Sequence, residues 1–260
     1  MSEAINDAKA AWVRNIPDTF DQAITGPRGR APDVALALAQ HDDYVTRLRE
    51  SGLSVSAVAA DPSYPDCVFI EDTAVLIGDP IAVVARPGAP ERRGEVDAVH
   101  DALVPSFEVI AIEPPGTLDG GDVMVIGDIV YVGLSARTNQ LGAGQLASIA
   151  SEIGLRAVTV PVSGVLHLKS GALPVSEDTI VVTKGTVEES LFEGLRIVHE
   201  DPEERHLFSA LPLSDRVLTT AQAPTTNALV ERLGLAVDPI DVSEILAVDG
   251  GLTCMSIIER

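Results

Sequence analysis

The stretch GDVMVIGDIVYVGLS, residues 121–135, holds two apolar runs on either side of a Gly-Asp turn. Both runs are short and rich in β-branched residues, which predicts two strands. Residues 138–153 follow with helical character, and Gly154 is a typical helix stop. The next apolar run, RAVTVPV at residues 156–162, predicts a third strand. This stretch therefore opens a unit with the order strand, strand, helix, strand.

The same order of elements recurs on both sides of this unit. The other predicted helices, each between apolar runs, cover residues 31–51, 91–103, 187–192 and 225–233. The result is about five ββαβ units at a period near 50 residues, with negligible sequence identity between them. The first run, AWVRNI at 11–16, has no partner before it, and the last, LTCMSII at 252–258, has no helix after it. Pairing these two end strands would close the fold, so we expect a propeller-like α/β fold in a single domain over residues 1–260.

The helix predicted over residues 31–51 has a clear pattern. Pro32 suits a first-turn position, Asp33 favours the positive end of the helix dipole, and Gly52 stops the helix. A doubly wound α/β sheet is the alternative fold, although the strand-strand-helix rhythm fits it less well than strict alternation would. The face of this helix that we expect to be buried holds Val34, Leu38, His41, Val45 and Leu48.

Composition limits the possible partners. The chain carries 18 Lys and Arg against 39 Asp and Glu, a net charge of -21. This charge repels nucleic acid and anionic membrane surfaces and attracts a small cationic molecule, although solubility accounts for most of it. No apolar stretch approaches the roughly 18 residues of a membrane span, and the first residues lack the apolar core of a signal peptide. Two cysteines make no disulfide framework, and five histidines lack structural-zinc spacing, so we expect a cytoplasmic protein without metal or cofactor.

Polar residues interrupt the apolar run that opens each unit, at similar places. If these runs are equivalent strands, the polar residues converge on one central pocket. Each has a structural explanation by itself, because Asp-Gly-Gly-Asp is usually a turn and a histidine or cysteine among apolar residues usually packs in the core. We interpret Cys67 as such a core residue. The converging set is Asp66, Glu71, Asp72, Asp119, Asp122, His167 and Cys254.

This set supports nucleophilic chemistry on a cation. A thiol with an ordinary pKa near 8.5 is only about a few per cent thiolate at neutral pH, and a neighbouring cation favours the thiolate. His167 can donate a proton to a leaving group and later activate water, with Asp119 as the carboxylate that orients it. Further carboxylates match the paired N–H donors of a guanidinium group.

These motifs resemble the guanidino-modifying, or pentein, superfamily, and most closely the dimethylarginine dimethylaminohydrolase family. The resemblance runs from about Trp12 to Ile258, and the motifs keep the family's order. They are PDCVFIEDTAV at 65–75, RPGAPERRGEV at 86–96, TLDGGDV at 117–123, VGLSARTNQ at 132–140, GVLHLKSGA at 164–172 and VDGGLTC at 248–254.

The resemblance implies a five-bladed α/β-propeller around a central pocket. It also implies hydrolysis of dimethylarginine or monomethylarginine to citrulline and di- or monomethylamine, through a covalent cysteine thiouronium and without a cofactor. Cys254 is then the nucleophile, His167 the general acid and base, and Asp119 the carboxylate partner of His167.

The resemblance also implies a set of substrate contacts. Residues 21–30 match the family's pocket-covering loop poorly, which leaves the lid contact, Ile24 or Thr25, open. It is equally open whether Asp249 touches substrate or only shapes its turn. The expected contacts are Glu71 and Asp72 at the guanidinium, Asp66 near the α-amino group, Arg92 and Arg137 at the α-carboxylate, and the Val248 carbonyl as a main-chain contact.

Several alternatives stay open. Arginine deiminases share the cysteine, the histidine and the Gly-Gly-Asp strand, but they typically carry an acid two residues after the histidine, where this chain has Lys169. Amidinotransferases share the nucleophile but usually have longer chains. A non-catalytic binder of cationic amino acids would keep the acidic pocket. Zinc on Cys254 and His167 is expected only as an inhibitor, because two ligands are too few for a structural site. The sequence leaves the preferred N-substituent and the choice between monomer and homodimer undetermined.

Overall fold

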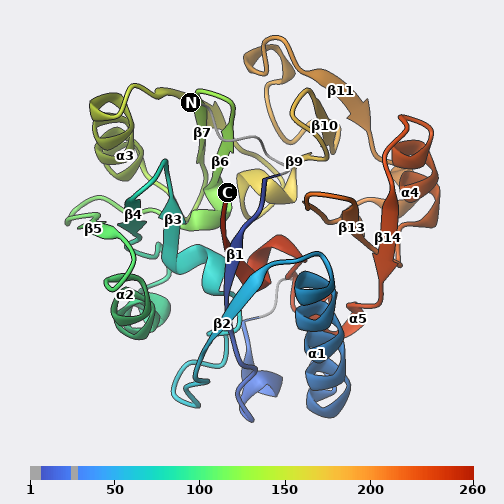
Figure 1. The fold of residues 1–260 in the computed structure, drawn as a ribbon, viewed down its shortest axis with the longest axis horizontal. Coiled ribbons are helices and arrows are strands. Elements are labelled where there is room, and N and C mark those ends of the chain that lie inside the picture. The colour runs from blue at the N-terminus through green and yellow to red at the C-terminus, as the bar shows by residue number, and fades with distance from the viewer. Residues whose placement is uncertain (1–6, 25–28) are drawn as a thin grey trace. The chain divides into compact units, whose positions relative to one another are not determined.

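The structure, a computed structural model, describes residues 7–24 and 29–260 of the chain. The described residues form two compact units. Figure 1 labels helices and strands of both. The first unit runs from Glu71 to His199, and the second combines residues 7–70 with Glu200–Arg260. Both units mix strands and helices, so the α/β class expected from the sequence is confirmed.

Three sheets of one topology make up the described part of the first unit. In each sheet the first strand pairs antiparallel with the second, and the third pairs parallel with the second. The strands are β3 (Ala74–Leu76), β4 (Ile81–Val84) and β5 (Glu108–Ala111), then β6 (Val123–Ile126), β7 (Ile129–Leu134) and β8 (Arg156–Pro161), then β9 (Ala172–Pro174), β10 (Thr179–Val182) and β11 (Arg196–His199). The connections to the third strands contain α2 (Val96–Leu103), α3 (Gln140–Glu152) and a 3₁₀ turn at Glu189–Leu191.

The Gly121–Ser135 stretch forms the hairpin β6–β7, as the sequence predicts. Val123 pairs with Val132, and Gly127 in the turn has φ 60°, a conformation that glycine adopts without side-chain strain. α3 follows, and the side chain of its N-cap residue, Asn139, accepts the Gly142 N–H at 2.8 Å. A hydrophobic core that includes buried residues of α3 and of these strands holds this part together.

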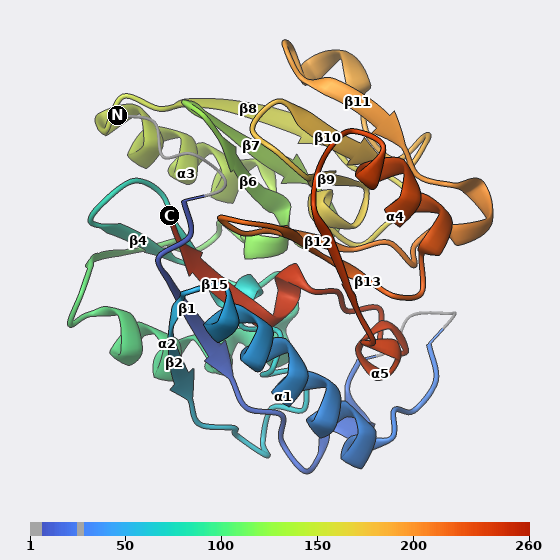
Figure 2. The same cartoon turned by 45° about the vertical axis from the view of Figure 1, so that its right-hand side comes forward.

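The second unit contains two described sheets with the same pairing pattern. β1 pairs antiparallel with β15, with Trp12 opposite Ile257, and parallel with β2 (Figure 2). The predicted pairing of the two end strands is therefore confirmed. The strands are β15 (Ser256–Glu259), β1 (Ala10–Arg14) and β2 (Ser54–Val58), then β12 (Ala210–Pro212), β13 (Val217–Thr220) and β14 (Val237–Ile240), with α1 (Val34–Glu50) and α4 (Pro224–Glu231) as connections.

α1 differs from the sequence prediction at two positions. Asp33 is the N-cap, and its carboxylate accepts two backbone N–H groups of the first turn, so Pro32 precedes the helix instead of lying in its first turn. Leu38, expected on the buried face, is 43% exposed, and Ala37 is buried instead. The spacing of the apolar residues predicted a buried helix face that is rotated slightly from the face that is buried in the structure.

Short 3₁₀ turns, rather than continuous strands, hold or directly follow the polar residues that open four of the sheets. The turns contain Glu71, Asp72, Asp122 and Cys254, and they directly follow Asp119 and His167. These residues were expected on strands, and this expectation is wrong. The apolar pattern could not distinguish a turn of three or four residues from the strand that continues it. The turns are η2 (Ile70–Thr73), η4 (Gly120–Asp122), η5 (Leu168–Ser170) and η8 (Thr253–Met255), which lie just before β3, β6, β9 and β15.

Two helical segments also differ from expectation. The helix predicted over residues 187–192 is only the 3₁₀ turn Glu189–Leu191, and α5 (Ser243–Leu246) was not predicted because four residues show no helical period. Across the described ranges, no helix combines the length and apolar character that crossing a membrane requires.

Candidate active site

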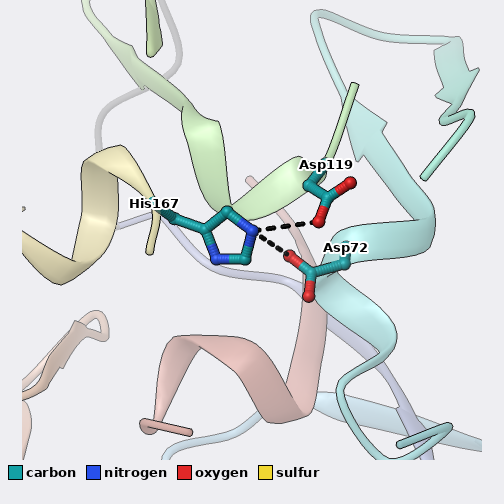
Figure 3. A group of neighbouring side chains, drawn as sticks. All are labelled: Asp72, Asp119 and His167. Carbon is teal, nitrogen blue, oxygen red and sulfur yellow. Dashed lines mark hydrogen bonds and ion pairs between the residues drawn. The ribbon is translucent and has the colours of Figure 1, made fainter. Parts of the chain in front are cut away.

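Three buried ionisable side chains of the first unit meet where η2, η4 and η5 come together (Figure 3). His167 Nε2 lies 3.0 Å from Asp119 Oδ2 and 3.8 Å from Asp72 Oδ1. Asp119 and His167 occupy equivalent places directly before η4 and η5, whereas Asp72 lies within η2. The structure therefore puts the expected acid–base histidine beside its expected carboxylate partner, and their catalytic roles stay predictions.

Gly120 and Gly121 allow this close approach of the turns. A Cβ atom on Gly121 would lie 2.8 Å from His167 Nδ1 and 2.9 Å from Asp72 Oδ1. A Cβ atom on Gly120 would overlap the carbonyl oxygen of Glu71. The Asp-Gly-Gly-Asp motif is therefore a turn, and it is also the place where backbone must fit against the ionisable cluster.

Asp119 is held through both of its carboxylate oxygens. Gly88 N–H donates to Oδ1 at 2.8 Å, and Arg137 Nη1 lies 3.3 Å from Oδ2. The backbone N–H of Asp119 donates to Thr138 Oγ1 at 3.1 Å. A carboxylate fixed in this way can hold the His167 ring in one orientation. Arg137, expected at the substrate α-carboxylate, thus lies next to Asp119, and its substrate contact stays a prediction.

Arg92 forms a buried ion-pair network with two carboxylates. Its Nη1 donates to Asp72 Oδ2 at 2.5 Å, and its Nε and Nη2 donate to the two oxygens of Glu95 at 3.0 and 2.8 Å. Burial opposes ionisation of Asp72, but His167 and Arg92 outweigh it and lower the pKa of Asp72 to about 2. The expected contact of Arg92 with a substrate α-carboxylate stays a prediction. Glu95 was not singled out from the sequence, although a spacing of three residues suits an ion pair on a helical turn.

The pKa of His167 is raised to about 9. Burial alone would lower it, because a buried cation loses its hydration, but the carboxylates of Asp72, Asp119 and Asp122 outweigh this effect. His167 is therefore an imidazolium at neutral pH. Nε2 donates to Asp119, and Figure 3 shows Nδ1 pointing away from both carboxylates. Nδ1 is thus the ring nitrogen that can pass a proton to another group.

Glu71 pairs with a lysine from the neighbouring turn. Lys169 Nζ donates to Glu71 Oε1 at 2.6 Å and to the carbonyl oxygen of Gly120 at 3.1 Å. Lys169, which stands where arginine deiminases typically carry an acid, therefore neutralises Glu71, a carboxylate expected to hold the substrate guanidinium. That role of Glu71 stays a prediction.

Cys254 belongs to the second unit, where it lies in the middle of η8 directly before β15. It is half-buried and packs against the hydrophobic core of this unit, which also includes Val248. Because β15 pairs with β1, this segment is held firmly although it lies near the end of the sequence. Neither Cys67 nor Cys254 forms a disulfide bond in the described chain.

The loop before Cys254 has a constrained backbone. Asp249 has φ 60°, in the left-handed region that aspartate tolerates better than most residues. A Cβ atom on Gly250 would lie 2.5 Å from the ring of Phe69, and the Leu252 N–H donates to Ser209 Oγ at 2.9 Å. Asp249 therefore shapes the turn, and a contact with substrate stays a prediction.

Asp66 is attached to the segment predicted as a lid. Both of its carboxylate oxygens lie 3.2 Å from the Ile24 N–H. Asp66 is 7% exposed, whereas Ile24 is 39% exposed. Thr25, the other candidate for the lid contact, lies outside the described residues. The role of Asp66 at a substrate α-amino group stays a prediction.

The cluster of Asp72, Asp119 and His167 also has the spacing of a metal site, with one ligand atom of each within 4.8 Å of the others. These atoms are already engaged: Asp72 binds Arg92, and Asp119 binds the imidazole ring. A bound metal cation would compete with the imidazolium proton and with the guanidinium. The arrangement therefore suits proton transfer better than metal binding, and a catalytic role of the cluster stays a prediction.

The chain matches known proteins over most of its length. Residues 18–218 match the family described as N,N dimethylarginine dimethylhydrolase, eukaryotic. The N(G),N(G)-dimethylarginine dimethylaminohydrolase of Streptomyces coelicolor is 37% identical over 251 residues, which are 96% of this chain and 96% of that protein.

Two solved structures share the fold. One is a cysteine-to-serine mutant of the Pseudomonas aeruginosa dimethylarginine dimethylaminohydrolase complexed with citrulline, with a TM-score of 0.93 and 32% identity over 97% of this chain and 100% of that chain. The other is a histidine-to-glycine variant of a dimethylarginine dimethylaminohydrolase as an adduct with S-methyl-L-thiocitrulline, with a TM-score of 0.91, 32% identity and the same coverage. On the family match and the identity to these relatives, the chain belongs to the dimethylarginine dimethylaminohydrolase family.

Proposed function

We propose that this protein hydrolyses Nω-methylated arginine, as dimethylarginine or monomethylarginine, to citrulline and di- or monomethylamine. The observation that carries the proposal is the buried His167–Asp119 pair, in which the pKa of His167 is about 9. An imidazolium is the form that can protonate a leaving amine at neutral pH. Membership of the family supplies the reaction class.

In the first half of the reaction, the thiolate of Cys254 attacks the guanidinium carbon of the substrate. The C–S bond forms, and the methylated nitrogen accepts a proton from His167 Nδ1. The C–N bond then breaks, the methylamine leaves, and a thiouronium stays on Cys254. A cationic substrate and an imidazolium both favour the thiolate over the thiol.

In the second half, neutral His167 accepts a proton from water, and the resulting hydroxide attacks the thiouronium carbon. The hydroxyl group of the resulting adduct loses its proton to solvent as the C–S bond breaks, so neutral citrulline is released and the thiolate and imidazolium are restored. Asp119 accepts the Nε2–H throughout, so the same ring nitrogen, Nδ1, acts in both halves. We expect a bell-shaped pH dependence, whose basic limb reports the loss of the imidazolium.

The proposal also assigns the substrate contacts. Carboxylates suit the substrate guanidinium because their oxygens match its paired N–H donors. The paired N–H donors of arginine side chains suit the substrate α-carboxylate for the same reason. Glu71 and Asp72 would hold the guanidinium, Asp66 the α-amino group, Arg92 and Arg137 the α-carboxylate, and the Val248 carbonyl would add a main-chain contact.

A closed five-bladed propeller with a central pocket belongs to this proposal. The strand order common to all five described sheets and the pairing of β1 with β15 support it. Residues 1–260 would then be one catalytic domain, acting in the cytoplasm. The net charge of -21 supports a cationic amino acid as the partner rather than nucleic acid or a membrane surface.

The direct test measures citrulline and released amine from dimethylarginine, monomethylarginine and arginine. We expect citrulline and an equal amount of the methylamine from the methylated substrates. Faster release of citrulline and ammonia from arginine would instead favour a deiminase. Binding of the methylated arginines without any citrulline would contradict the proposal and indicate a non-catalytic binder.

Two cysteine variants test the assignment of the nucleophile. Cys254→Ser should abolish turnover while binding of dimethylarginine persists in calorimetry. Cys67→Ser is the matched control, because Cys67 is a buried thiol for which the reaction has no use, and it should retain turnover. Retained turnover in Cys254→Ser would remove Cys254 from the mechanism.

A further inference from the structure

Asp122 is a fully buried carboxylate that the proposed reaction does not use directly. It is the last residue of η4, three residues after Asp119. Its Oδ1 accepts the backbone N–H of Leu168 at 2.8 Å, and its Oδ2 accepts the hydroxyl of Ser135 at 2.6 Å. Leu168 directly follows His167, so Asp122 holds the backbone that carries the imidazole.

The second carboxylate oxygen of Asp122, Oδ2, is connected through Ser135 to the turn that carries Arg137. Ser135 Oγ accepts the backbone N–H groups of Arg137 at 3.0 Å and Thr138 at 3.3 Å. The turn that carries these two residues is therefore tied to Asp122 through one hydroxyl group. Thr138 Oγ1 in turn accepts the N–H of Asp119, which completes the hydrogen-bonded network.

Strand β7 is shaped to accommodate this carboxylate. A Cβ atom on Gly133 would lie 2.6 Å from Asp122 Oδ1 and 2.8 Å from the Cβ of Leu168. Burying a carboxylate is unfavourable unless hydrogen bonds compensate, and here backbone and hydroxyl donors do so. Burial raises the pKa of Asp122, and His167, Ser135, Thr138 and Leu168 oppose the increase.

We propose that Asp122 is a positioning residue for the hydrolysis: it fixes His167 through the Leu168 N–H and the Arg137 turn through Ser135. This inference rests on the proposed function for its effect on catalysis. Asp122 touches neither substrate nor the reacting atoms in this scheme. It acts by holding the general acid and an expected substrate-binding arginine in one hydrogen-bonded frame.

Asp122 also contributes charge to the surroundings of His167. The charged groups that face the ring are the carboxylates of Asp72, Asp119 and Asp122. Arg92 and Arg137 pair with Asp72 and Asp119 respectively, and Lys169, two residues after His167, pairs with Glu71. Removal of the Asp122 charge should lower the pKa of His167, because one of three facing anions is lost.

The experiment compares two substitutions of the same side chain. Asp122→Asn keeps an oxygen for the Leu168 N–H and removes the charge, whereas Asp122→Ala removes both. We expect kcat on dimethylarginine to fall about tenfold in Asp122→Asn and about a hundredfold in Asp122→Ala, with smaller changes in KM. The basic limb of the pH profile should move to lower pH in Asp122→Asn.

Ser135→Ala distinguishes the two contacts of Asp122, because it breaks the link to the Arg137 turn and leaves the hydrogen bond to the Leu168 N–H. In this variant KM on dimethylarginine should rise more than kcat falls. Asp128→Asn is the control, since Asp128 is an exposed carboxylate in the turn of the same hairpin, and it should behave as wild type. Unchanged kcat, KM and pH profile in Asp122→Asn and Ser135→Ala would overturn the proposal, even if Asp122→Ala fails to fold.

A titration of the His167 ring by nuclear magnetic resonance keeps this test independent of turnover. If the wild type releases no citrulline, the proposed function fails, and the titration still tests Asp122. A pKa of His167 that is lower in Asp122→Asn than in wild type supports the inference, and identical titration curves contradict it.

Discussion

Arg92 and Glu95 meet through paired hydrogen bonds, in which Nε and Nη2 of the guanidinium donate to the two oxygens of one carboxylate at 3.0 and 2.8 Å. Both residues are buried, with 4% and 1% exposure. The third guanidinium nitrogen, Nη1, donates to Asp72. The pair therefore fixes Asp72, which faces the imidazole of His167.

Replacement of this arginine should destabilise the fold strongly. Arg92→Met leaves the buried carboxylate of Glu95 without its cation and Asp72 with only the His167 imidazolium, and we expect the free energy of unfolding to fall by about 3–5 kcal/mol. Urea denaturation followed by circular dichroism measures the loss. Arg93→Met is the control, because the Arg93 guanidinium is only partly buried and donates to the Pro87 carbonyl at 3.1 Å. Equal losses in the two variants would show that the ion-pair network is not the cause.

Asp119→Asn should impair catalysis more than binding. The carboxylate accepts the Nε2–H of His167, whereas an amide can present its own N–H and favour the wrong tautomer. We expect kcat on dimethylarginine to fall by at least about a hundredfold with a smaller change in KM. Steady-state kinetics at neutral pH measure this effect. Asp101→Asn, which neutralises an exposed carboxylate on α2, should leave both constants unchanged.

The fold was largely predictable because its signals are local. One sheet is predicted by two apolar runs on either side of Gly127 and Asp128, followed by a helix and a third apolar run. The same order of elements elsewhere in the chain predicts the other sheets. The unpartnered first and last runs predict the pairing of β1 with β15. The 3₁₀ turns that precede the strands were not predictable, because three or four residues are too few to show a period.

The site was predictable only in part, for a different physical reason. The roles expected of Asp119 and His167 came from the converging polar residues and from the motif resemblance, and the contact between the two side chains is seen in the structure. The bonds from Asp122 to the Leu168 N–H and from Ser135 to the Arg137 N–H join segments far apart in sequence. Such contacts depend on how the turns approach one another in space, and no residue pattern encodes them.

His41 should make the protein sensitive to acid. It lies buried on α1, its Nε2 has no hydrogen-bond partner among the described residues, and burial lowers its pKa to about 4. Because this pKa is below the unfolded value of about 6.5, stability is present above about pH 6.5 and is lost as pH falls toward about 4. We expect the unfolding free energy of wild type relative to His41→Leu to fall by about 2 kcal/mol from pH 8 to pH 5.

Urea denaturation at the two pH values measures this difference. His100→Leu is the matched control, since His100 is an exposed histidine on α2, and it should keep the pH dependence of the wild type. An unchanged pH dependence in His41→Leu would show that His41 does not contribute to acid sensitivity.

His167 should stabilise the protein in the opposite pH range. Its pKa in the folded protein is about 9, above the unfolded value of about 6.5, so the folded state binds the proton more tightly. The contribution is fully present below about pH 6.5 and is lost as pH rises through about 9. We expect the difference in unfolding free energy between wild type and His167→Gln to shrink by about 3 kcal/mol from pH 6 to pH 9.5. Urea denaturation at both pH values measures it, and a difference that is independent of pH would show that His167 is not held as an imidazolium by its carboxylates.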